Sequence, residues 1–226
     1  MSGFVLCDEA TVRETVRAAV EMCEVVDVHT HLFPPSHGDL MLWGIDELLT
    51  YHYLISEFFM IAPSNISVKS FAAMSKEAQA DLIWEHLFVK RSPVSEAQIG
   101  VLTTLNILGL GEQVRNRDLI GIRQWYKKQS PHEYARNVFR LARVKYAVMT
   151  NIPFDTEETA HWLDQEKVIP DYLKTALRID PILNGDWGSI VNSLKKEGLE
   201  ESLEGAKDFL RMWVKRIKPL YLMAST

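Results

Sequence analysis

The sequence of 226 residues is poor in cysteine and has no long hydrophobic run, and each absence narrows the class of protein. No apolar stretch approaches the roughly 18 residues that a membrane-spanning helix needs, so we expect no membrane partner. Residues 1–9 lack the basic start and the long apolar stretch of a secretory signal. The two cysteines, Cys7 and Cys23, are therefore expected to be reduced thiols of a cytoplasmic protein, with Cys23 in the core.

Neither sign of charge dominates the chain. Lys and Arg number 25 against 30 Asp and Glu, which gives a net charge of −5. Because acidic and basic residues are mixed along the chain, no basic stripe predicts nucleic-acid binding. The sequence also lacks a glycine-rich phosphate turn, a Gly-x-Ser-x-Gly elbow and a Cys-His nucleophile pair. With these motifs absent, the histidines are the main candidates for catalytic or metal-binding residues.

A pair of histidines follows a short apolar segment near the start of the chain. Residues 24–29 have the length and the β-branched content of a buried strand, and His29 and His31 stand at its end. Side chains two residues apart in a strand point to the same face, so both imidazoles can converge on one metal ion. In a (β/α)8 barrel this strand end would lie at the mouth that carries the active site. The simpler alternative is a polar strand end without metal. Asp27 before the pair and the turn at Pro34–Pro35 after it favour the metal site.

Strands and helices alternate after residue 144. Strands are expected at 144–149, 175–180 and 217–223, separated by helices at 156–165, 187–197 and 200–216. This alternation is typical of a parallel sheet. The predicted fold class is α/β, as part of a (β/α)8 TIM-type barrel, and the alternative is an open α/β sheet that is complete in itself.

The pattern between the first and second strands is helical almost throughout, with one helix expected to run from Asp46 to Phe59. The expected organisation is a single incomplete barrel domain in three parts. Residues 1–43 hold an N-terminal helix and strand 1, residues 44–143 form a large helical insertion, and residues 144–226 carry strands 2 to 4 with their helices.

Four stretches resemble motifs of one family in their order and spacing. They are Val26–Leu32, Ile45–Leu54, Val144–Pro153 and Leu177–Asp180. The first resembles the strand-1 signature of the amidohydrolase superfamily, and the other three narrow the match to its uronate (glucuronate) isomerase branch. The resemblance implies a metal-dependent barrel with a long helical excursion after strand 1, and the chain looks like the N-terminal half of such a protein.

The resemblance implies roles for five residues. His29 and His31 would bind a divalent metal, with zinc as the expected ion. Tyr53 would hydrogen-bond the substrate and His52 would assist catalysis. Arg178 would grip the carboxylate of a sugar acid through its planar guanidinium. The implied reaction is aldose–ketose isomerisation of glucuronate or galacturonate, in which a base moves a proton between adjacent carbons.

The motifs also depart from the family pattern. Thr50 and Tyr51 replace the Gly-Asp of a Gly-Asp-His-Tyr motif, and Asn151 and Ile152 replace both acids of a Thr-Asp-Asp-Pro turn. A Phe-Arg-Pro-Asp strand end keeps its arginine and its aspartate, Asp180, but loses the proline.

Structural alternatives stay open for the substrate-binding candidates. Arg178 could form a salt bridge to Asp180 or Asp155. Tyr53 could belong to an aromatic helix face buried within the insertion. Among the other histidines, His37 and His161 are expected at the surface.

Two further functions also stay open. One is a metal-dependent hydrolase or decarboxylase, because the His-x-His pair is common to the whole superfamily. The other is a non-catalytic fragment that binds a partner. Since the family's remaining metal ligands come from later strands, we expect the chain to need a missing C-terminal half or a homo-oligomer. The expected small-molecule partner is a sugar acid.

Overall fold

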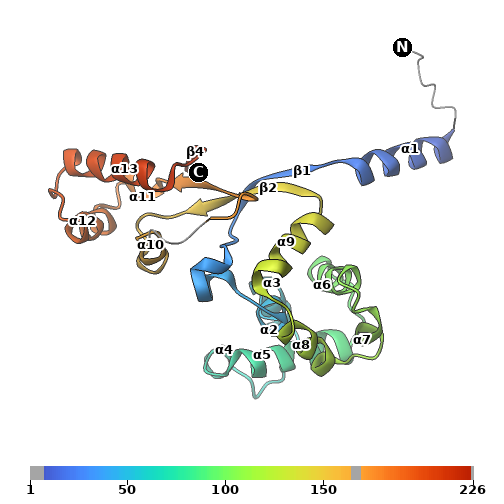
Figure 1. The fold of residues 1–226 in the computed structure, drawn as a ribbon. Coiled ribbons are helices and arrows are strands. Elements are labelled where there is room, and N and C mark those ends of the chain that lie inside the picture. Colours follow the sequence, from blue (N-terminus) through green and yellow to red (C-terminus); the bar gives the residue numbers. More distant parts are fainter. Residues whose placement is uncertain (1–7, 164–168, 225–226) are drawn as a thin grey trace, which may run out of the picture. The chain divides into compact units, whose positions relative to one another are not determined.

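The computed structural model describes residues 8–163 and 169–224 and divides into two compact units (Figure 1). The first unit runs through His37 and resumes at Ala135, and the second spans Gly38–Tyr134. Cys7 lies outside the described residues. Within the ranges described, no helix combines the length and the apolar character that crossing a membrane requires. The predicted bounds of the helical insertion stay a prediction.

The first unit contains the strands, all in one sheet. Its helices and strands are α1 (Glu9–Met22), β1 (Val25–Thr30), β2 (Val144–Asn151), α10 (Thr156–Trp162), β3 (Leu173–Arg178), α11 (Asp180–Leu183), α12 (Trp187–Lys196), α13 (Leu203–Ile217) and β4 (Tyr221–Met223). The strands pair in the order β1-β2-β3-β4 and every pairing is parallel. Neighbouring strands of a (β/α)8 barrel follow one another in this way.

Helices cover one face of this sheet. Leu177 of β3 packs against apolar residues of α12 and α13, including Leu194 and Trp213. Met149 of β2 packs on the same side in a smaller cluster with Trp162 of α10. Since side chains alternate along a strand, the residues between these point to the opposite face. None of the described helices forms an apolar cluster with that face, which is called the helix-free face below. The register assigns Thr150, Ala176, Arg178, Tyr221 and Met223 to that face.

The sheet curls toward its helix-free face. The hydroxyl of Tyr221 in β4 donates a hydrogen bond to the backbone carbonyl of Val28 in β1, although two strands lie between them. In a flat sheet these two strands would be about 14 Å apart, at roughly 4.8 Å per strand. The observed class is therefore mixed α/β with a curled, parallel, four-stranded half-barrel, consistent with part of a TIM-type barrel.

Three expectations for the strands and for Cys23 need correction. The first strand is not buried, because β1 pairs only with β2 among the described residues, and Val28 is 63% exposed. Cys23 is exposed rather than in the core. The fourth strand is shorter than expected, because α13 continues to Ile217 and ends where Lys218 adopts a left-handed conformation. Pro219 then offers no backbone N–H, so pairing begins only afterwards.

The second unit contains helices α2 to α8 around an apolar core. They are α2 (Ile45–Leu49), α3 (His52–Phe59), α4 (Val68–Ala72), α5 (Lys76–Ile83), the π-helix η2 (Trp84–Val89), α6 (Glu96–Ile107), α7 (Gly111–Arg115) and α8 (Leu119–Lys127). Two helical elements cross the boundary between the units, the 3-10 segment η1 (Pro35–Met41) and α9 (Pro131–Leu141). The core includes Leu49, Phe58, Leu105 and Ile122.

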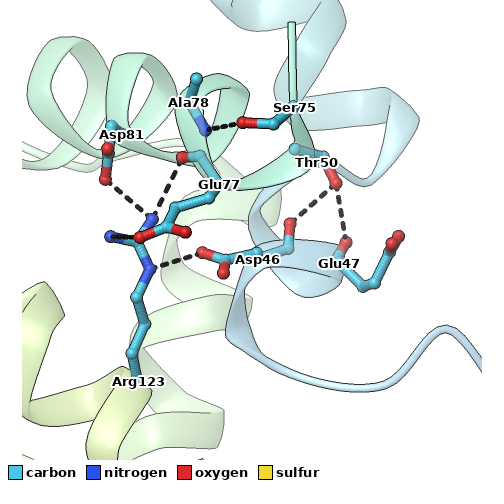
Figure 2. Close-up of polar contacts among 8 residues, drawn as sticks. All are labelled: Asp46, Glu47, Thr50, Ser75, Glu77, Ala78, Asp81 and Arg123. Atoms are coloured by element: carbon cyan, nitrogen blue, oxygen red, sulfur yellow. Dashed lines mark hydrogen bonds and ion pairs between the residues drawn. The ribbon is translucent and has the colours of Figure 1, made fainter.

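The helix expected from Asp46 to Phe59 is broken in two. Thr50 ends α2, where its hydroxyl donates to the carbonyl of Asp46 at 2.7 Å, and Tyr51 adopts an extended conformation before α3 begins. Asp46 does not cap the helix. Its carboxylate accepts instead from Arg123 of α8, which also pairs with Asp81 of α5 (Figure 2). Arg123 thus ties three helices of the second unit together.

Candidate metal and substrate site

The end of β1 brings His29 and His31 together. Their Nε2 atoms lie 3.3 Å apart, and the rings meet edge to face with centroids 5.0 Å apart. The strand carries an irregularity here, because Asp27 pairs with Ala147 while Thr30 pairs with Met149 two positions later. The backbone N–H of His29 donates to the Asp27 carboxylate at 3.0 Å.

The register decides which way the two histidines point. Thr30 pairs with Met149, whose side chain lies on the helix-covered face. The residues on either side of Thr30 therefore point to the helix-free face, which is the inner face of the curled sheet. Both His29 and His31 thus stand on the inner face at the carboxyl end of β1, as expected from their spacing.

The separation of the two nitrogens fits a shared metal ion. Two imidazole nitrogens at 2.0–2.1 Å from a tetrahedral zinc ion would be about 3.3 Å apart. The Nε2 atoms of His29 and His31 have this spacing, and both side chains are exposed. Within the described ranges, no third His, Cys, Asp or Glu joins them in a group able to hold a metal. The pair therefore fits two positions of a four-coordinate site.

Arg178 stands on the same face of the sheet, at the end of β3. Its Nε donates to Oδ2 of Asp180 at 2.8 Å and its Nη2 donates to Oδ1 at 3.4 Å. The salt bridge to Asp180, one of the alternatives for this arginine, is therefore present. A forked contact of this kind fixes the plane of the guanidinium. The substrate-binding role of Arg178 stays a prediction.

Glu158 is a buried carboxylate that the sequence did not single out. It lies in α10, is 3% exposed and accepts three hydrogen bonds at the end of β2. The donors are Asn151 Nδ2 at 2.8 Å, the Ile152 backbone N–H at 2.9 Å and Trp162 Nε1 at 3.0 Å. Burial raises the pKa of Glu158, and the three hydrogen bonds oppose that shift. The only available signal was an acidic residue in the first turn of a helix, which ordinarily indicates nothing beyond a favourable helix dipole.

The segment after the histidine pair is held by aromatic contacts. His37 is fully buried, so its expected surface position is wrong. Its ring stacks on Phe33 with centroids 5.6 Å apart and on His161 of α10 at 5.0 Å. The Trp162 ring meets the His37 ring in a T-shaped arrangement, with centroids 5.1 Å apart. The contacts with His161 and Trp162 come from residues far apart in sequence from His37, which is why periodicity could not reveal them.

His52 and Tyr53 begin α3 in the second unit. The break after α2 places both in the first turn of a helix, where Tyr51, His52 and Tyr53 form a cluster of rings. Tyr53 is 58% exposed, so the alternative of a tyrosine buried within the insertion is wrong, although Phe58 of the same helix is buried. The catalytic and substrate-binding roles of His52 and Tyr53 stay predictions.

A solved structure matches this arrangement closely. A uronate isomerase from Bacillus halodurans C-125 is 42% identical to the chain and superposes with a TM-score of 0.87 over 97% of it. The predicted resemblance to the uronate isomerases is confirmed. The chain spans only 52% of the length of that isomerase, which fits the expected N-terminal half. No family model matches the chain, and no curated protein matches it significantly.

Proposed function

We propose that the chain forms half of a metal-dependent uronate isomerase, an enzyme that interconverts the aldose and ketose forms of a sugar acid. The observation that carries this proposal is the 42% identity and the TM-score of 0.87 to a uronate isomerase over nearly the whole chain. The substrate class is glucuronate or galacturonate, and the setting is the cytoplasm. A base removes the proton from the carbon beside the carbonyl and a proton returns to the former carbonyl carbon.

His29 and His31 are the metal ligands that this chain contributes. The proposal is supported by their Nε2 separation of 3.3 Å and by their common position on the inner face. The expected ion is zinc, which would polarise the hydroxyl and carbonyl oxygens of the substrate. In the proposed enzyme, neutral imidazoles keep both Nε2 lone pairs free for the ion, so binding requires deprotonated histidines.

Arg178, His52 and Tyr53 are the substrate-facing residues in this proposal. Arg178 binds the carboxylate of the sugar acid through its planar guanidinium, which Asp180 holds in one orientation. Tyr53 hydrogen-bonds the substrate and His52 assists the proton transfer. The exposure of the Tyr53 ring supports a role outside the core of the second unit.

The remaining metal ligands belong to a partner segment in this proposal. Among the described residues, β1 and β4 each pair along one side only, so both edges of the half-barrel can take up further strands. We expect the rest of the barrel, or a second copy of the chain, to cover these edges and complete the active site. The isolated chain as a monomer should therefore be inactive.

The test is reconstitution. The chain is co-expressed with the part of the Bacillus halodurans isomerase that it does not match, and zinc, glucuronate and galacturonate are supplied. We expect turnover of a uronate with both chains present and none with the chain alone, with light scattering reporting association. An associated, zinc-loaded complex that turns over neither uronate would contradict the proposed function. Activity of the 226-residue monomer would contradict the incomplete site.

A hydrolase or decarboxylase is the second candidate, because Asn151 and Ile152 stand where the family motif has two acids. The same complex should be offered a panel of esters, lactones, amides and carboxylates. Turnover of one of these in place of uronates would favour the second candidate. Metal bound in stoichiometric amount would argue against a non-catalytic fragment.

A further inference from the structure

Glu158 occupies an unusual environment for a carboxylate. It is almost fully buried, and the three donors that face it are an amide, a backbone N–H and an indole, all of them neutral. Removing a carboxylate from water is costly, and neutral donors compensate less than a cation would. The three bonds hold the end of β2 and the Trp162 side chain to one rigid group.

Trp162 connects Glu158 to the segment that follows the histidine pair. The N–H of the Trp162 indole is held by Glu158 at 3.0 Å, and the indole meets the ring of His37 in a T-shaped arrangement with centroids 5.1 Å apart. His37 in turn stacks on Phe33, which is two residues after His31. The backbone N–H of His37 donates to the carbonyl of Pro34 at 2.9 Å and closes the turn. A continuous set of contacts thus joins Glu158 to the segment that directly follows His31, the second of the two proposed metal ligands.

We propose that Glu158 is a positioning residue, which fixes the segment 32–37 through Trp162 and thereby holds His31 beside His29. The effect on zinc rests on the proposed function, whereas the effect on the segment does not. A glutamine at this position would keep the volume but would turn an N–H group toward one of the three donors. Glu158→Gln therefore replaces one of the two acceptor oxygens by a donor and leaves the packing nearly unchanged.

The experiment compares the metal-free parent chain with three variants. They are Glu158→Gln, Trp162→Phe, which loses the indole N–H together with part of the ring system, and Glu157→Gln. Glu157 is the exposed neighbour in the same helix and serves as the matched control. Hydrogen exchange followed by mass spectrometry should show at least tenfold faster exchange at residues 32–37 in the first two variants only. Exchange in β3 and α12 should stay as in the parent chain.

Zinc titration by calorimetry supplies the second measurement, with the His29→Ala, His31→Ala double variant giving the background. Removing a residue that orients a metal ligand typically lowers metal affinity by about 10–100-fold. We expect a loss of this size in Glu158→Gln and none in Glu157→Gln. If the parent chain binds no zinc above background, the metal proposal fails, and the exchange data still decide the role of Glu158.

Two results would overturn the positioning role. One is unchanged exchange at residues 32–37 in both folded variants, Glu158→Gln and Trp162→Phe. The other is equal acceleration throughout the first unit, which would mean general destabilisation. If Glu158→Gln does not fold, Trp162→Phe decides by the same criteria.

Discussion

The Nδ2–H of Asn151 donates a hydrogen bond to Oε1 of Glu158 inside the first unit, and the two atoms are 2.8 Å apart. The resemblance to the uronate isomerases would place an acid at position 151. An acid there would bring two carboxylates within hydrogen-bond distance in a buried site, where they repel each other. The asparagine supplies a hydrogen-bond donor instead. The departure from the family motif at position 151 therefore suits the buried carboxylate of Glu158 beside it.

Replacing this asparagine by aspartate should destabilise the fold in a pH-dependent way. In Asn151→Asp the two buried carboxyl groups would share one proton, which raises a folded-state pKa above its unfolded value. A raised carboxyl pKa contributes stability below the unfolded pKa, and that stability is lost as the pH rises through the folded pKa. Burial already raises the pKa of Glu158, which adds to this trend.

Urea denaturation at pH 5 and pH 7.5 measures this effect. We expect a loss of about 1–3 kcal/mol in the free energy of unfolding at the higher pH and a smaller loss at the lower pH. Asn65→Asp, at an exposed turn of the second unit, is the control and should change little. Equal losses at both pH values in Asn151→Asp would mean that the two carboxyl groups do not interact.

Arg178→Lys tests the proposed binding of the substrate carboxylate by Arg178. Lysine keeps the charge but cannot make the forked contact that Arg178 makes with Asp180 or bind a carboxylate through two N–H groups. In the reconstituted enzyme we expect a raised KM for uronates, equivalent to about 1–3 kcal/mol of lost binding. Arg211→Lys, an exposed pair with Asp208, is the matched control. A KM equal to that of the parent enzyme would leave Arg178 with a structural role only.

Arg123→Gln should weaken the second unit. The Arg123 side chain is 12% exposed and bonds Asp46 at 2.8 Å and Asp81 at 2.7 Å (Figure 2). Both partners are more exposed, so the expected loss is about 2 kcal/mol, between the values for exposed and for buried ion pairs. Urea denaturation should show this loss, whereas Arg91→Gln at an exposed position should leave the midpoint unchanged. A similar midpoint for both variants would show that the three-helix link contributes nothing.

The sequence was a good guide to elements with local causes. The strand at 144–149, the helix opened by Pro131 and the same-face position of His29 and His31 follow from periodicity, capping and alternation. Burial was predicted less well. The sequence pattern of an apolar segment such as β1 predicts burial whether or not a neighbouring strand covers it. Only the order of strands in the sheet shows that β1 is exposed.

Long-range side-chain contacts were beyond sequence reasoning. Glu158 meets Asn151 only because α10 folds back on the end of β2, and His37 is buried only because Trp162 and His161 lie against it. Neither position carries a periodic or spacing signal. Further ligands of the proposed metal site would belong to the same class, because metal sites assemble side chains from separate strands.

A zinc titration of the chain, followed by nitrogen NMR of its histidine side chains, tests the proposed metal site most directly. We expect the Nε2 signals of His29 and His31 to shift together and to saturate at one zinc per chain. His29→Ala and His31→Ala should each abolish the shift of the remaining partner, while the ring of buried His37 stays unaffected. Zinc that shifts neither signal, or unchanged zinc binding in both variants, would contradict the proposed metal site.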